Sequence, residues 1–260
     1  MKKLLVLMLL FLCLFSLALA EDDSLAKVLE KGVLTVAISP DYAPYEYIRA
    51  DDTLAGSDIK FAEYIAKDLG VELQFDRMNF QACLAAVQTG ASDVVISSLG
   101  WKEERAEIMN LSDLYNDNMI FTVLVRKEDA DTLTTAESFT GKVIACQNGA
   151  TTESMTRESL DCTVELIKSA GDGVMALLSG KVDGVSLSVG VAESLAAQND
   201  KLAVSSYIFD YVGKGNVVAT MKGNDTLTTR INEIIRTCKE QGLFEVWMQE
   251  AQEESAAEGV

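Results

Sequence analysis

The sequence has 260 residues, of which 40 are acidic and 22 are basic, and its formal charge at pH 7 is −18. Such an acidic surface repels nucleic acid and anionic lipid, so nucleic-acid binding is excluded as a function class. The sequence contains no histidine, which excludes a Ser-His-Asp or Cys-His catalytic site and a histidine zinc site. We expect no bound metal and no other cofactor.

The first twenty residues have the layout of a cleavable secretory signal. Two lysines precede an apolar run over residues 4–17, and small residues end at Ala20, just before an acidic stretch. We predict cleavage after Ala20, which leaves an extracytoplasmic chain that begins at Glu21. The two lysines leave with the signal and no acid does, so 20 basic and 40 acidic residues remain, with a formal charge of −20.

Two other interpretations of this N-terminal segment are open. As an uncleaved anchor, the apolar run would be shorter than the roughly 20 residues that cross the hydrocarbon core of a bilayer. As a lipoprotein signal, the segment would be cleaved before Cys13, where Leu12 stands in the place of a small residue. The site after Ala20 fits its processing pattern better than either.

The rest of the chain alternates between the patterns of strands and helices. Short β-branched runs indicate strands, and apolar residues at helical spacing that end at a glycine indicate helices. In the first part of the chain we expect a strand over residues 33–39, a helix over 58–69, a strand over 71–75, a helix over 80–88 and a strand over 93–97. In the second part we expect a strand over residues 142–146, a helix over 151–159, a strand over 163–167, a helix over 172–178 and a strand over 182–187. This alternation predicts a mostly parallel α/β sheet in each part, and hence two lobes.

Two segments are expected to join these lobes. Residues 112–125 are predicted to be extended and to pass from the first lobe to the second. The strand predicted over residues 216–220 and the helices over 225–239 and 243–252 have no sheet of their own, so we assign them to the first lobe. Residues 250–258 are acidic, and we expect them to be frayed and solvated.

The predicted division therefore places two crossings between two lobes. Its parts are a first lobe in residues 21–115 and 216–260, a second lobe in 120–210, and hinge crossings near 115–119 and 210–215. Gly213 and Gly215 supply backbone freedom in the second crossing. Ligands of open α/β sheets collect at the carboxyl ends of the strands, so we expect the binding site in a cleft between the lobes of a monomer.

Four cysteines remain after the signal is removed, namely Cys83, Cys146, Cys162 and Cys238. Export permits disulfides but does not require them, and four cysteines allow three pairings. None of the spacings is that of a metal site. Disulfides and buried free thiols both stay open, and we expect none of the four to be required for ligand binding.

The loops that follow the predicted strands carry a series of motifs. They are Asp41-Tyr42-Ala43-Pro44-Tyr45-Glu46-Tyr47, Asn79-Phe80, Ser97-Ser98-Leu99-Gly100, Glu103-Glu104-Arg105-Ala106 and Gln147-Asn148-Gly149-Ala150-Thr151-Thr152. The series resembles the amino-acid-binding branch of bacterial solute-binding proteins, the type II periplasmic binding proteins that serve ABC importers. The resemblance covers residues 32–247. It implies a two-lobed α/β fold with two open sheets, a two-segment hinge and a ligand cleft, and a protein that captures a small carboxylate, such as an amino acid, for a membrane ABC permease.

Arg105 is the first candidate for ligand binding, because a planar guanidinium can bind a carboxylate through two parallel charge-assisted hydrogen bonds. The resemblance assigns this role to it, and assigns the rest of the carboxylate site to the loop from Ser97 to Gly100. Tyr42 and Phe80 match positions where aromatic rings stack on the aliphatic part of the ligand. The structural alternatives are an ion pair of Arg105 with a neighbouring acid and ordinary core packing of the two rings.

Further candidates lie at the start of a predicted helix in the second lobe. The hydroxyls of Thr151 and Thr152, and the free backbone N–H groups there, can bind an anion. Helix capping is the alternative role of these hydroxyls. The complete set of predicted ligand-binding residues is Tyr42, Phe80, Ser97, Ser98, Gly100, Arg105, Gln147, Thr151, Thr152 and Ser188.

The sequence departs from the family pattern at two of these positions. Ser188 stands where the family has the aspartate that binds the ligand's amine, and Gly100 stands where a serine or threonine is usual. A serine cannot neutralise a buried ammonium, and an unpaired buried charge costs several kcal/mol. Either another acid, Asp41 or Asp183, supplies the charge, or the ligand has no free α-amine.

Two other function classes share this architecture. One is a periplasmic dehydratase of prephenate-like acids, in which Glu46 or Asp41 would be the general acid. The other is a sensory module fused to a membrane receptor, which requires a spanning helix that the sequence after Trp247 does not offer. We therefore predict a binding protein and no enzymatic activity.

Overall fold

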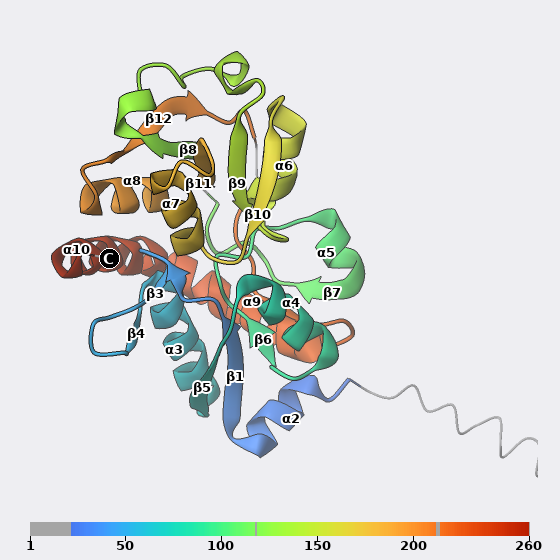
Figure 1. Ribbon diagram of the computed structural model, residues 1–260. Coiled ribbons are helices and arrows are strands. Elements are labelled where there is room, and N and C mark those ends of the chain that lie inside the picture. The colour runs from blue at the N-terminus through green and yellow to red at the C-terminus, as the bar shows by residue number, and fades with distance from the viewer. Residues whose placement is uncertain (1–21, 118, 212–213, 260) are drawn as a thin grey trace, which may run out of the picture.

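The computed structural model describes residues 22–117, 119–211 and 214–259, so the predicted signal and Gly213 lie outside the described residues. The chain forms two lobes, each built on a five-stranded sheet (Figure 1). The two-lobed α/β fold predicted from the sequence is confirmed. Among the described helices, none combines the length and the apolar character needed to cross a membrane.

The sheet of the first lobe has the strand order β5-β1-β6-β13-β7. Strand β1 pairs in parallel with β5 and β6, whereas β13 pairs antiparallel with β6 and β7. The strands are β5 (Glu72–Arg77), β1 (Val33–Ile38), β6 (Val94–Val95), β13 (Ala219–Met221) and β7 (Met109–Leu111). Because β13 comes late in the sequence, the chain returns to this sheet after it has built the second lobe.

Helices cover both faces of the first sheet. Side chains alternate between the faces along each strand, and apolar side chains occupy both faces. Val36 lies in one core cluster with Phe61, whereas the next residue, Ala37, lies in another cluster with Phe80. The helices of this lobe are α2 (Ser24–Lys31), α3 (Ser57–Leu69), α4 (Phe80–Thr89), α5 (Glu103–Ile108) and α9 (Asp225–Glu240). The strand pattern of the sequence thus reflects burial on both faces.

The sheet of the second lobe has the strand order β10-β9-β11-β8-β12. Strand β9 pairs in parallel with β10 and β11, and β8 pairs antiparallel with β11 and β12. The strands are β10 (Thr163–Ile167), β9 (Val143–Gln147), β11 (Gly184–Ser188), β8 (Phe121–Arg126) and β12 (Leu202–Ile208). Its helices are α6 (Thr151–Ser159), α7 (Ala170–Leu178) and α8 (Val189–Gln198).

The sequence did not predict every element. The segment 112–125 was expected to be an extended connection, but most of β8 lies within it and pairs with two strands of the second sheet. A third, small sheet in the loop after β1 was also missed, with strands β2 (Asp41–Tyr42), β3 (Glu46–Ile48) and β4 (Leu54–Ala55). Helices α2, α5 and α8 and strands β7 and β12 were not predicted either.

The C-terminal helix α10 (Leu243–Glu258) corrects another expectation. Residues 250–258 are helical rather than frayed, because Ala251 and Ser255 are buried and Arg49 forms ion pairs with two acids of this segment. The buried face is made of small residues, so composition alone did not reveal it. Helix α10 packs against α3 and α9 and also contacts α8 of the second lobe.

The chain passes between the two sheets twice, from β7 to β8 and from β12 to β13. The two passing segments are bonded to each other, since the N–H of Asn216 donates to the carbonyl of Asn116 at 2.8 Å. Gly215 has a φ of +115°, and a Cβ there would lie 2.2 Å from the carbonyl oxygen of Asn116. Only glycine fits this approach. That these segments act as a hinge stays a prediction.

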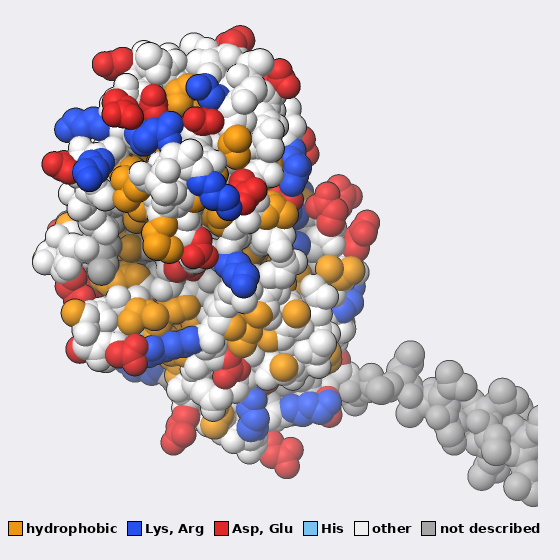
Figure 2. All heavy atoms as spheres, in the orientation of Figure 1, with side chains coloured by type: hydrophobic (Ala, Val, Ile, Leu, Met, Phe, Trp, Pro, Cys, Tyr) orange, Lys and Arg blue, Asp and Glu red, His pale blue; other side chains and the backbone are white. Residues whose placement is uncertain are grey.

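The four described cysteines are free thiols, and Cys162 alone among them is partly exposed. Within the described part of the chain, no cluster of three or more histidine, cysteine or acidic side chains could hold a metal ion. On the face drawn in Figure 2, acidic and basic side chains are interspersed over both lobes, and hydrophobic side chains are most frequent around their junction.

Candidate ligand-binding site

A cavity of about 50 Å³ lies between the lobes, where strands of both sheets end. In the first lobe, Ser39 follows β1, and Ser97 and Ser98 follow β6. In the second lobe, Gln147 is the last residue of β9, and Leu187 is the next-to-last residue of β11, just before α8. The carboxyl ends of parallel strands meet here, which is where open α/β sheets bind ligands.

Eight of the ten predicted ligand-binding residues line this cavity, namely Tyr42, Phe80, Ser97, Ser98, Gly100, Gln147, Thr151 and Thr152. Arg105 and Ser188 do not line it, although both are buried and each contacts a residue that does. The sequence did not single out several lining residues, including Trp101, Phe121, Ser186, Tyr211, Lys214 and Asn216. That any of these residues binds a ligand stays a prediction.

Arg105, on the short helix α5, lies directly behind the cavity wall and is only 5% exposed. Its guanidinium donates hydrogen bonds to the carbonyl oxygens of Gly100 and, across the cleft, of Gly149 at 2.6 Å. It also lies 5.6 Å from the ring centroid of Phe80. Burial lowers the pKa of Arg105 to about 10, so the group is charged at neutral pH. Its ion pair with a neighbouring acid, the alternative raised by the sequence, does not occur among the described residues.

Gly100 and Thr151 bring the two lobes into close approach. A Cβ at Gly100 would lie 2.4 Å from the Oγ1 atom of Thr151, so the serine or threonine that is usual at this position does not fit the present arrangement. The Oγ1 atom of Thr151 is buried and makes no hydrogen bond. The glycine therefore gives room to a hydroxyl from the opposite lobe.

Two lysines place further positive charge beside Arg105. The Nζ atom of Lys102 donates to the carbonyl oxygen of Ala150 in the second lobe at 3.0 Å, and burial, followed by the charge of Arg105, lowers its pKa. Lys214 lies 3.2 Å from the ring centroid of Trp101, which is a cation–π contact. Of the two lysines, Lys214 lines the cavity, whereas Lys102 lies behind its wall, as Arg105 does.

Two buried acids, Glu46 and Asp58, lie on the first-lobe side, and of the two only Glu46 lines the cavity. Ser97 and Ser98 donate their hydroxyls to the two carboxyl oxygens of Glu46, at 3.0 and 3.1 Å. Asp58 accepts the N–H of Ser98 at 2.7 Å and the hydroxyl of Tyr115 at 2.9 Å. Burial, and then the charge of Asp58, raises the pKa of Glu46 well above its usual value, and burial raises the pKa of Asp58 to about 6. The pair therefore retains a proton under conditions in which exposed acids lose theirs.

Asp41 and Tyr42 connect the small sheet of the first lobe to the second lobe. The Oδ2 atom of Asp41 accepts the N–H of Ala170, at the start of α7, at 2.7 Å, where the helix dipole favours a negative charge. The hydroxyl of Tyr42 accepts the N–H of Ser188 at 2.9 Å. Burial raises the pKa of Asp41. Asp41 is thus an acid that lines the cavity and bridges the lobes.

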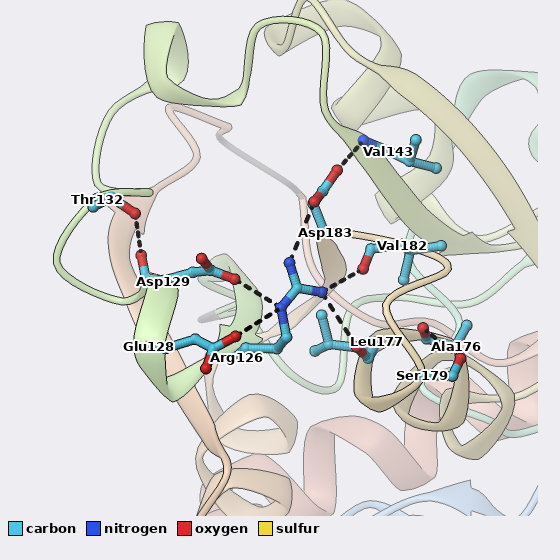
Figure 3. A network of polar contacts seen from close by, with 10 residues as sticks. All are labelled: Arg126, Glu128, Asp129, Thr132, Val143, Ala176, Leu177, Ser179, Val182 and Asp183. Atoms are coloured by element: carbon cyan, nitrogen blue, oxygen red, sulfur yellow. Dashed lines mark hydrogen bonds and ion pairs between the residues drawn. The ribbon is translucent and has the colours of Figure 1, made fainter.

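Asp183 does not belong to the site, so the hypothesis that it replaces the missing aspartate is wrong. Its two carboxyl oxygens bind the guanidinium of Arg126 at 3.3 Å and the N–H of Val143 at 2.9 Å (Figure 3). Arg126 also forms an ion pair with Asp129 at 2.8 Å. This network holds the second lobe together, and of the two acids raised by the sequence only Asp41 lines the cavity.

The model of the bacterial extracellular solute-binding proteins, family 3, matches residues 34–250 of the sequence. The chain belongs to this family. The L-cystine-binding protein TcyJ of Escherichia coli (strain K12) is 28% identical to this family member over 228 residues, which are 87% of this chain and 85% of that protein.

Solved structures show the same relationship. An amino acid ABC transporter substrate-binding protein, AbpA, from Streptococcus pneumoniae, bound to L-arginine, has a TM-score of 0.84 and 30% identity, with 89% of this chain and 99% of that chain covered. The ancestral amino-acid-binding protein AncCDT-1, a precursor of cyclohexadienyl dehydratase, has a TM-score of 0.77 and 25% identity, with 87% and 98% covered. All three are named as binding proteins, and the name of AbpA places it in an amino acid ABC transporter.

Proposed function

We propose that this family 3 protein captures a small carboxylate of the amino-acid type outside the cytoplasmic membrane and delivers it to the permease of an ABC importer. The observation that carries the proposal is the unpaired charge of Arg105. A buried cation without a counter-ion is costly, and no described carboxylate lies within ion-pair distance of this guanidinium. A ligand carboxylate would supply the missing negative charge through two parallel hydrogen bonds.

The contacts of Arg105 also support a role for the ligand in closing the cleft. Its bond to Gly149 joins the first lobe to the second, as does the bond from Ala170 to Asp41. A carboxylate held by Arg105 and by the N-terminal end of α6 at Thr151 would join the lobes at the same place. We propose that the segments 115–119 and 210–215 are the hinge of this closure.

For an amine on the ligand, we propose Asp41 as the partner, because Asp41 lines the cavity and Asp183 does not. Ser188 offers no charge, and its N–H is bonded to Tyr42. Asp41 lines the cavity and carries a carboxylate. If the ligand has a free α-amine, we expect Asp41 to face it. Relatives include proteins named for the amino acids cystine, arginine and histidine, which is consistent with an α-amine.

The predicted place of action follows from the family and the sequence together. The family is extracellular, and a cleavable signal over residues 1–20 would bring the chain there. We propose a soluble, monomeric protein that begins at Glu21 after cleavage. N-terminal sequencing of the exported protein tests the cleavage site, and a mature start elsewhere than Glu21 overturns it.

A dehydratase is the second candidate function, because Glu46 lines the cavity and its pKa is raised, as a general acid requires. The hydroxyls of Ser97 and Ser98 and the nearby Asp58 occupy this carboxyl group, which favours a structural role. Incubation of the protein with prephenate or arogenate tests the alternative. Formation of an aromatic product would establish the enzyme, and an unchanged substrate supports binding alone.

The ligand itself can be identified in two steps. Native mass spectrometry of the freshly purified mature protein should show a retained small molecule, because tight binders often keep their ligand. A thermal screen should then compare L-amino acids with their deaminated and N-acylated counterparts. Carboxylates should raise the melting temperature, and a free α-amine should be required if Asp41 faces it. A screen in which no carboxylate changes the melting temperature would overturn the proposed function.

A further inference from the structure

Two polar side chains in the cavity wall are buried without any hydrogen-bond partner. They are Ser186 in the middle of β11 and Asn216 in the second crossing, which are 1% and 0% exposed. Neither belongs to the ligand-binding set predicted from the sequence. Buried polar groups in folded proteins are nearly always hydrogen-bonded, so each exception requires a reason.

The backbone of Asn216 is fully engaged, which fixes the place of this residue in the cavity wall. Its N–H donates to Asn116 at 2.8 Å, and its carbonyl accepts the N–H of Tyr115 at 2.9 Å. The side-chain oxygen and nitrogen of Asn216 both lack partners. An amide group that can donate and accept therefore lies in the cavity wall with neither capacity used.

Ser186 interrupts an apolar strand. Its neighbours Val185 and Leu187 belong to the hydrophobic core of the second lobe, and every residue of β11 is buried. The hydroxyl of Ser186 has no partner, so it stabilises nothing within the fold. Ser186 also lies in the cavity wall, next to the space that a ligand would enter.

We propose that Asn216 and Ser186 form a second polar subsite, which binds an uncharged carboxamide-type group of the ligand whose carboxylate Arg105 binds. This subsite rests on the proposed function. A primary amide presents one donor and one acceptor side by side, which matches the two unused groups of Asn216. A charged group fits less well, because neither Asn216 nor Ser186 carries a charge that could neutralise it.

The test measures dissociation constants of L-glutamine, L-asparagine and L-norleucine for the parent protein and for three variants. Asn216→Leu keeps the size of the side chain and removes both polar atoms, and Ser186→Ala removes a single oxygen. Ser57→Ala is the matched control, because the hydroxyl of Ser57 is also buried without a partner but does not line the cavity.

We expect Asn216→Leu to raise the dissociation constant of the amide that binds best by roughly tenfold, and Ser186→Ala by a smaller factor. Binding of L-norleucine should be unaffected, and Ser57→Ala should bind all three as the parent does. The melting temperature of each ligand-free variant should stay level or rise, because an unpaired polar group has been removed. A residue that merely supports the fold would lower it instead.

The outcomes separate this subsite from the proposed function. If the parent binds amino acids, Arg105→Ala abolishes binding, and Asn216→Leu and Ser186→Ala bind the amides like the parent, the subsite is refuted and the proposed function stands. Equal losses for L-norleucine and for the amides also refute it. If the parent binds none of the carboxylates tested, the proposed function fails and the subsite fails with it. Ser186→Ala keeps the test valid even if Asn216→Leu disturbs the crossing.

Discussion

Arg105 and Arg126 are both largely buried, one in each lobe, but their partners differ. Arg126 has ion pairs with Asp129 and Asp183 and donates to the carbonyls of Leu177 and Val182 (Figure 3). Arg105 has two carbonyl partners and no described carboxylate. The fold therefore neutralises Arg126 by itself, whereas no described acid neutralises Arg105, and we propose that a ligand anion does so. The missing partner, rather than the residue type, indicates function.

Replacing Arg126 should have the largest effect on stability. Arg126→Ala leaves Asp129 and Asp183 without their cation and two carbonyls without a donor; for side chains that are 22% to 29% exposed, we expect a loss of about 1 to 3 kcal/mol. For a chain of this size, that loss lowers the melting temperature by roughly 2 to 12 °C. Ligand-induced stabilisation should survive, because Arg126 does not line the cavity.

A matched control for this variant is Arg157→Ala. The side chain of Arg157 is 49% exposed and pairs with Glu153 on the surface, where such pairs contribute about 1 kcal/mol or less. Thermal unfolding of both variants checks the comparison. Equal melting temperatures for the two would show that the network around Arg126 does not hold the lobe together.

Replacing Arg105 should have the opposite effect to replacing Arg126: it should remove the ligand-induced stabilisation and leave the stability without ligand nearly unchanged. At a hundredfold excess over the dissociation constant, a bound ligand stabilises the parent by about 2.7 kcal/mol, which raises the melting temperature by roughly 5 to 11 °C. Arg105→Ala should lose this shift, and Arg105→Lys should retain little of it, since an ammonium cannot make two parallel bonds. Without ligand, Arg105→Ala should melt close to the parent, because no acid loses its partner. A full ligand shift in Arg105→Ala would contradict the site.

The sequence predicted the parts of the fold that depend on local pattern. Strand β1 and helices α3 and α4 were found because apolar spacing and terminal glycines mark them. Strand β8 was not recognised, because a continuous apolar extended run has the same pattern whether it pairs or merely crosses. Its partner β12 comes about eighty residues later, and that pairing is a tertiary property.

The candidate site was predictable to a similar extent. Loops after strands converge in this fold, and the resemblance to the solute-binding proteins singled out Phe80, Gly100 and Thr151 within them. The contact of Gly100 with Thr151 was not predictable, because it joins residues of different lobes. Asn216 and Ser186 were missed because burial and the lack of a partner are visible only in three dimensions, although a serine within an apolar strand was a signal.

A substitution at Gly100 tests whether the cleft beside Arg105 closes when ligand binds. Gly100→Ser places a Cβ too close to the Oγ1 atom of Thr151, and overpacking of this kind costs about 1 to 3 kcal/mol. The closed form should bear this cost, so ligand affinity should fall while the melting temperature without ligand changes less. Thr151→Ala in the same chain should restore part of the affinity, which a double-mutant cycle by calorimetry measures. Additive losses would show that the two residues do not meet on closure.

The smallest expected effect on stability concerns Glu46 and Asp58. A retained proton, rather than a cation or a ligand, reduces the negative charge of this buried pair. Because their pKa values are raised in the folded state, the folded state binds protons more tightly than the unfolded state. Their stabilising contribution is therefore complete below about pH 4 and is lost as the pH rises through about 6 and above.

Glu46→Gln removes one charge of the pair, so its stability relative to the parent should increase from pH 5 to pH 8. Urea unfolding at several pH values measures this difference, with Glu30→Gln as the control, because Glu30 is exposed and does not line the cavity. A constant difference for Glu46→Gln would show that the pair is already ionised at pH 5.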